Sequence, residues 1–94
     1  MSESVCHYTE EGVKVWLKDG EYHLEDGPAI KHPDGRKYWC IDGKLHRNNG
    51  PAIEYENGSI EWYHKGVWCP TLNYYMSLVG MTKEEQMLFV LQWS

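Results

Sequence analysis

Short segments in which apolar and polar residues alternate run through positions 1–70 of the chain. Three of them are rich in aromatic and β-branched types and read VKVWLK at 13–18, RKYWCI at 36–41 and SIEWYH at 59–64. A period of two with this composition is typical of half-buried β-strands. Because proline lacks a backbone donor and suits the first residue of a strand, we expect PAIKH and PAIEY, which begin at Pro28 and Pro51, to pair with them.

Turn signals separate these segments at a regular spacing of seven or eight residues. Eight of the nine glycines follow it, and the whole pattern repeats after 23 residues. Repetition on this scale indicates stacked units, none of which can bury a face alone. The residues that recur at this offset, and that we expect to be structural, are Trp16, Trp39 and Trp62; Gly20, Gly43 and Gly66; Gly27 and Gly50; Pro28 and Pro51; and His23 and His46.

The dipeptides Asp34-Gly35, Asp42-Gly43 and Asn57-Gly58 lie between expected strands. Such pairs favour two-residue type I′ turns, in which both central residues have positive φ. The sequence therefore predicts an antiparallel meander of hairpins with a two-strand repeat.

The alternation places Trp16, Trp39 and Trp62 on one face of the sheet and Tyr38 and Tyr63 on the other. Equivalent residues two strands apart are separated by roughly 9–10 Å, too far for indoles to stack on each other. We expect Ile30 and Ile53 from the intervening strands to fill the gaps. This interpretation makes the tryptophans core residues and not a binding stripe.

After Pro70 the pattern becomes helical. A first amphipathic helix is indicated by apolar residues at i, i+3, i+4 and i+7, with Gly80 as its C-cap; the apolar positions are Leu72, Tyr75, Met76 and Val79.

A second helix is expected from about Lys83 to Gln92, because Thr82 and Glu85 form a capping box. Residues 87–91 are apolar on every side, which is unusual for a surface helix. One face is expected to close the open end of the sheet, and the remainder to insert deeper or to meet another chain. The predicted fold is thus mainly β with C-terminal helices (α+β), with a hairpin array at 1–70 and a helical cap at 71–94.

Composition narrows the function classes. The 94 residues carry a formal charge of −5 with acidic and basic residues interspersed, which disfavours nucleic acid and anionic membrane surfaces as partners. No apolar run approaches the ~20 residues of a membrane span, and the N-terminus does not resemble a signal peptide. Cys6, Cys40 and Cys69 are odd in number and widely spaced, which favours free thiols in a reducing, cytoplasmic compartment.

One possible metal site is formed by His23, His46 and Cys69, which share a repeat column. Ligands of one zinc lie a few Å apart, whereas repeat-equivalent positions are roughly 9–10 Å apart. Other partners, such as His7 or His64, have no supporting spacing. We therefore expect no metal and no cofactor, and a structural role in which each histidine packs across its own turn and hydrogen-bonds a loop carbonyl.

Catalytic groups are equally poorly indicated. The serines and cysteines lie in no activated context, and every glycine is an isolated turn residue with no phosphate-loop spacing. The paired carboxylates are neighbours in sequence, whose side chains point apart. The sequence thus predicts no catalytic residues and a protein that is not an enzyme.

The stretch LHRNNGPAIEYENGSIEWYHKG at 45–66 resembles the repeat of MORN-like proteins. More closely it resembles the variant with tryptophan, asparagine-glycine, histidine-arginine and glycine-proline-alanine that occurs in proteins of tailed phages and large viruses. The resemblance covers about 7–68; it departs at Leu24, where the variant has arginine. It implies a β-hairpin array and a viral origin, and it implies contact surfaces but no chemistry.

Residues outside the repeat are therefore the best candidates for function. Tryptophan and tyrosine are enriched as anchors of protein interfaces. We expect Tyr74 and Trp93 to be interface residues and favour packing for Trp68, Tyr75 and Phe89. The candidate protein-binding residues as a set are Tyr74, Trp93, Trp68, Asn73, Tyr63 and Tyr38.

Three functions remain open. The first is a small viral protein that binds and inhibits a host protein in the host cytoplasm, such as an antiviral-defence component, in the manner of an anti-CRISPR protein. The second is a structural module that self-associates through 82–94. The third is a small-molecule sponge with an aromatic groove of Tyr22, Tyr38 and Tyr63, in which Arg36 or Arg47 would hold an anion.

Overall fold

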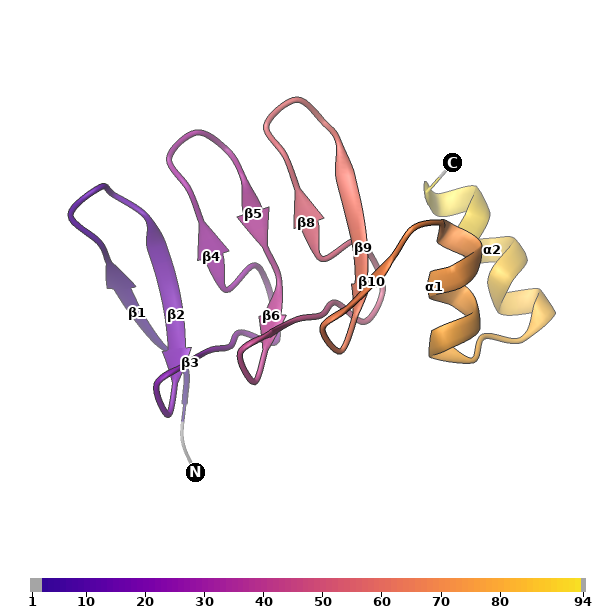
Figure 1. Ribbon diagram of the computed structural model, residues 1–94, viewed down its shortest axis with the longest axis horizontal. Coiled ribbons are helices and arrows are strands. Elements are labelled where there is room, and N and C mark those ends of the chain that lie inside the picture. The colour runs from indigo at the N-terminus through magenta and orange to yellow at the C-terminus, as the bar shows by residue number, and fades with distance from the viewer. Residues whose placement is uncertain (1–2, 94) are drawn as a thin grey trace.

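A long antiparallel β-sheet with two helices at its C-terminal end makes up the computed structural model, which describes residues 3–93 (Figure 1). The main sheet follows the order β1-β2-β4-β5-β8-β9-β10, with β3 paired to β2, and β6 and β7 form a separate hairpin. The predicted class, mainly β with C-terminal helices, is confirmed. The strands are β1 (Val5–Tyr8), β2 (Lys14–Lys18), β3 (Glu21–Tyr22), β4 (Ile30–Lys31), β5 (Lys37–Tyr38), β6 (Cys40–Ile41), β7 (Lys44–Leu45), β8 (Ile53–Glu54), β9 (Ile60–His64) and β10 (Val67–Cys69).

Strand register brings the tryptophans into one line across the sheet, with an alanine between each pair. Val15 pairs with Ile30, and the Trp16 N–H donates to Ala29 O at 2.8 Å, so Trp16 lies opposite Ala29. The same pairing continues through the sheet, because the Trp39 N–H donates to Ala52 O at 2.7 Å. The tryptophan row, as we name it, consists of Trp16, Ala29, Trp39, Ala52 and Trp62.

The prediction that isoleucines fill the gaps between the tryptophans is wrong. Ile30 and Ile53 pair with Val15 and Tyr38 and therefore lie on the opposite face. The spacers are Ala29 and Ala52, both fully buried. Bulky indoles on every second strand leave room only for a methyl group between them, which explains why the smaller residue of each Ala-Ile pair faces the tryptophans.

The turns fall into two classes, and the sequence predicted only the type I′ class. Positive φ at both central residues, the geometry of a type I′ turn, occurs at Asp42-Gly43 as expected and also at Asp19-Gly20 and Lys65-Gly66. At Asp34-Gly35 and Asn57-Gly58 only the glycine has positive φ, so the expected two-residue turns are wrong there.

These two turns are three-residue loops closed by an aspartate or asparagine side chain. The Gly35 N–H donates to His32 O at 3.1 Å, and Asp34 Oδ1 accepts the Arg36 N–H at 3.0 Å. Asn57 Oδ1 accepts the Ser59 N–H at 2.9 Å in the same way. A short polar side chain that bonds the backbone two residues on stabilises this alternative to the type I′ turn.

Buried histidines connect consecutive hairpins. Nδ1 of His23 accepts the Asp42 N–H at 3.1 Å, and Nδ1 of His46 accepts the Lys65 N–H at 2.9 Å. Each Nδ1 therefore accepts a backbone N–H 19 residues further on, a bond that the sequence did not predict. The acceptor nitrogen fixes the next type I′ turn against the preceding hairpin.

Helices α1 (Leu72–Val79) and α2 (Lys83–Trp93) pack against the last tryptophan of the row. The Trp62 ring centroid lies 4.8 Å from that of Tyr75, 5.6 Å from Phe89 and 5.6 Å from Trp93. Gly80 is the left-handed C-cap of α1, and the Thr82–Glu85 capping box forms both of its bonds, at 2.8 and 3.2 Å, as predicted. The helices thus cover the end of the tryptophan face.

The histidine connection can be tested at His46. Replacing it by alanine leaves the Lys65 N–H without its acceptor, so His46→Ala should lower the free energy of unfolding by about 1–3 kcal/mol. Asparagine carries an oxygen near the position of Nδ1, so His46→Asn should recover part of the loss. Urea unfolding followed by tryptophan fluorescence measures both variants, and equal losses for the two would contradict the role assigned to Nδ1.

Candidate functional site

The sheet is one layer thick, so it presents two faces. The tryptophan face carries the tryptophan row and ends under the helices. The tyrosine face carries Val15, Ile30, Tyr38, Ile53 and Glu61 in one cross-strand line. Binding residues can therefore lie on either face or on the outer side of the helices.

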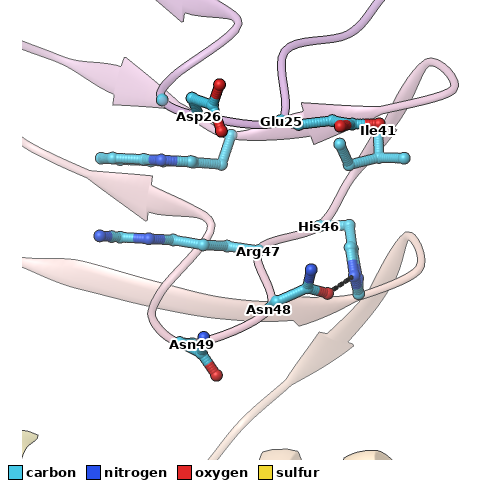
Figure 2. Close-up of a pocket in the computed structure, with 9 residues that line it drawn as sticks. Glu25, Asp26, Ile41, His46, Arg47, Asn48 and Asn49 are labelled. Carbon is cyan, nitrogen blue, oxygen red and sulfur yellow. Dashed lines mark hydrogen bonds between the residues drawn. The ribbon is translucent and has the colours of Figure 1, made fainter.

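A cleft of about 610 Å³ opens on the tryptophan face between the loops that follow β3 and β7. Figure 2 shows Glu25 and Asp26 on the first loop, opposite Arg47, Asn48 and Asn49 on the second. The cleft combines two exposed carboxylates, two exposed amides and the half-buried Trp39. This lining can bind a polar ligand, and it contains no serine, threonine, cysteine or lysine.

Arg47 is fixed inside this cleft. Its guanidinium lies 4.0 Å from the Trp39 ring centroid, and its Nη1 donates to Glu54 Oε2 at 2.8 Å and to Pro51 O at 3.2 Å. A stacked and paired guanidinium is a structural element, since one of its faces is covered by an indole and both Nη1 donors are used.

Packing around the second loop is tight. A Cβ atom on Gly50 would come within 2.9 Å of both Arg47 Cζ and Trp93 Cζ2. The buried Tyr75 hydroxyl lies 2.6 Å from Arg47 O and 3.0 Å from Asn48 O, and donates to this carbonyl pair. Burial raises the pKa of Tyr75 to about 12, so the hydroxyl stays protonated and available as a donor.

Hydrogen bonds define the roles of the two ring nitrogens of the histidine at the edge of the cleft. Because Nδ1 of His46 accepts the Lys65 N–H, its proton is on Nε2, which donates to Asn48 Oδ1 at 2.8 Å (Figure 2). No group of three or more histidine, cysteine or acidic side chains suited to a metal ion exists within residues 3–93. Cys69, the third member of the repeat column, is buried and its Sγ lies 3.5 Å from Val67 O.

The candidate protein-binding residues do not form one cluster. Trp68 pairs across the strands with Tyr63 on the tyrosine face, and its side chain is 54% exposed, although packing was expected. Tyr74 is 45% exposed on α1, beside the exposed Asn73. Tyr38 is half-buried at the middle of the tyrosine face, where its ring meets that of His32.

Trp93 lies elsewhere, on the tryptophan face. It packs edge-on against Trp62 and is mostly covered, and its Nε1 is buried without a hydrogen-bond partner among the described residues. Its position in the aromatic cluster makes it a residue that fastens α2 to the sheet. The sequence did not reveal this, because a residue next to the chain end gives no helical periodicity beyond it.

Of the two arginines considered for a small-molecule groove, Arg36 lies two residues before Tyr38 and so shares its side of the strand, whereas Arg47 lies on the other face. Arg36 is paired with Asp34 at 2.9 Å, and Arg47 lies on the tryptophan face, away from Tyr38. Both arginines are therefore engaged by acidic partners of their own.

Helix α2 exposes apolar side chains, as expected from residues 87–91, which are apolar on every side of the helix. Phe89 is buried, whereas Met87, Leu88 and Leu91 are 69%, 69% and 75% exposed. No helix within residues 3–93 has the length and apolarity needed to cross a membrane.

Comparison of the chain with protein-family models, with curated proteins and with solved structures found no match.

The pH dependence of stability should reveal the half-buried His64. Its ring lies 4.9 Å from that of His46, and burial, followed by the charges of His46 and Lys65, lowers its pKa below the ordinary 6.5. Below that pH the unfolded chain binds a proton that the folded protein does not, so stability should fall from about pH 6.5 down to the folded pKa.

Urea midpoints between neutral and mildly acidic pH measure this effect. His64→Gln should have a flatter profile than the parent, and His7→Gln, at an exposed position of β1, should leave the profile unchanged. Identical slopes for the parent and His64→Gln would contradict the assignment.

Proposed function

We propose that the chain is a small non-enzymatic protein-binding module of viral origin that inhibits a host protein, such as a component of bacterial antiviral defence. The viral origin and the target class come from the resemblance of 45–66 to repeats in phage proteins. The binding role comes from the surface of the C-terminal third.

The observation that carries the proposal is the exposed apolar surface near the helical end. Here the chain exposes two large aromatic side chains, Trp68 and Tyr74, together with aliphatic side chains of both helices. Anchors of this kind dominate the energetics of protein interfaces, and large apolar patches on soluble proteins mark interaction sites. The exposed apolar residues in this part of the chain are Val67, Trp68, Tyr74, Leu78, Val79, Met87, Leu88, Val90 and Leu91.

Affinity capture with single-site variants tests this proposal. We expect the tagged chain to retain one stoichiometric protein from a bacterial lysate, and Trp68→Ala or Tyr74→Ala to weaken the complex about 30-fold or more, because hot-spot anchors contribute at least about 2 kcal/mol. Tyr8→Ala is the matched control, since Tyr8 is an exposed aromatic residue (68%) on the far edge strand β1.

The result would count against the proposal if no partner were retained, or if Tyr8→Ala weakened the complex as much as the other two. Trp93→Ala is unsuitable as an interface variant, because it removes a ring that packs on Trp62 and would lower stability directly.

A second candidate function, self-association, is favoured by one observation. Met87, Leu88 and Leu91 are the most exposed large apolar residues of the described chain. Helices with such faces join copies of one chain in many symmetric oligomers.

Charge introduced on this face should separate the copies. If α2 is the joint, the parent should show a defined oligomeric mass, and Leu88→Glu with Leu91→Glu should yield a folded monomer by native mass spectrometry and circular dichroism. Deletion of 82–94 is a weaker test, since it also removes Phe89 and Trp93 from the aromatic cluster. A monomeric parent would exclude this function.

A further inference from the structure

Three lysines lie side by side on the tryptophan face. Lys14 pairs with Lys31 across β2 and β4, and Lys31 pairs with Lys37 across β4 and β5. Neighbouring strands are about 4.8 Å apart, so three ammonium groups can converge on one small ligand. We call these residues the lysine row.

The lysine row forms no ion pair in the part of the chain that the structure describes. No carboxylate among residues 3–93 lies within ion-pair distance of Lys14, Lys31 or Lys37. Glu54 is the next residue along the same line, opposite Lys37, but its Oε2 is bonded to Arg47 at 2.8 Å. Like charges directly opposite each other destabilise a sheet, so the row is unfavourable unless a negative charge binds to it.

Elsewhere on β2, a lysine faces an acidic residue and not another lysine. On β2 itself, Lys18 faces Glu21 across the strands, and the chain as a whole carries −5. An acidic protein that keeps three lysines in register, with no ion pair to any of them within residues 3–93, concentrates positive potential there.

The lysine row lies beside the open part of the tryptophan row. Lys14 is two residues before Trp16 and Lys37 two before Trp39, so each pair shares one side of its strand. Lys14 Nζ lies over the Trp16 ring, 5.4 Å from its centroid, as the Arg47 guanidinium lies over Trp39 at 4.0 Å, and both indoles are half-buried. A flat apolar ring next to a row of ammonium groups suits a ligand that combines a planar base with a phosphate chain.

We propose that the lysine row and Trp16 form a binding site for a mononucleotide with a di- or triphosphate. The lysine row holds the phosphates, and the indole of Trp16 contacts the base. A row of three charges matches one polyphosphate group, and the net charge of −5 opposes a longer polyanion. The site is independent of the protein-binding surface proposed above.

Titration of the full ¹⁵N-labelled chain with ATP, pyrophosphate and adenosine tests the site. ATP should bind saturably, shift the amides of the lysine row and the Trp16 indole signal, and bind more tightly than either fragment. Lys31→Gln should weaken ATP about tenfold, since a charge-assisted bond contributes about 1.5 kcal/mol or more. Lys44→Gln, an exposed lysine on β7, is the control with the same change in charge and should bind like the parent.

Thermal unfolding without ligand measures the repulsion among the three lysines in the free protein. Lys31→Gln relieves the repulsion, so it should unfold at a higher temperature than the parent at low salt, whereas Lys44→Gln should not. ATP should then stabilise the parent more than Lys31→Gln.

Four results would overturn the proposal. They are the absence of saturable ATP binding at millimolar concentrations, equal weakening by Lys31→Gln and Lys44→Gln, adenosine binding as tightly as ATP, and pyrophosphate binding as tightly as ATP. The third would remove the role of the lysine row, and the fourth that of Trp16.

Discussion

Alternation of large and small side chains along the tryptophan row is the constraint on which the rest of the structure depends. Ala29 and Ala52 are fully buried beside indoles on the neighbouring strands. A sheet one layer thick has no second layer to bury its apolar residues, so the indoles must cover the strands between them. The same row ends at Trp62, where the helices pack, and thereby joins the sheet to its cap.

Each surface of the molecule follows from this row. Because the tryptophan row occupies one face, Tyr38, Tyr63 and Trp68 occupy the other, where Trp68 is the most exposed of the three. Where the helices do not reach, the tryptophan face stays open, and Trp39 is covered instead by Arg47. The lysine row lies next to this open part. One packing rule thus positions an apolar surface at the C-terminal end and a basic, aromatic one in the middle of the sheet.

Much of the fold could be predicted because the signals are local. Alternation, turn dipeptides and the Thr82–Glu85 capping box specify elements within a few residues. The register was not local: Ile30 was expected beside the tryptophans, although the pairing puts Ala29 there. Each histidine connection joins residues 19 positions apart in sequence. The lysine row joins residues on three separate strands. The histidine connections and the lysine row become visible only when the strand register is known. The candidate interface residues differ in side-chain exposure, which the spacing of residues in the sequence does not give.

The most direct test of the tryptophan row is a double-mutant cycle between Ala52 and Trp39, measured by urea unfolding. If Ala52 is a spacer, Ala52→Leu should cost about 1–3 kcal/mol in the parent. In the background of Trp39→Leu, which makes room beside it, the cost should be smaller by at least about 0.5 kcal/mol, the lower range of coupling for residues in contact. An equal cost in both backgrounds, or no cost in the parent, would contradict the account.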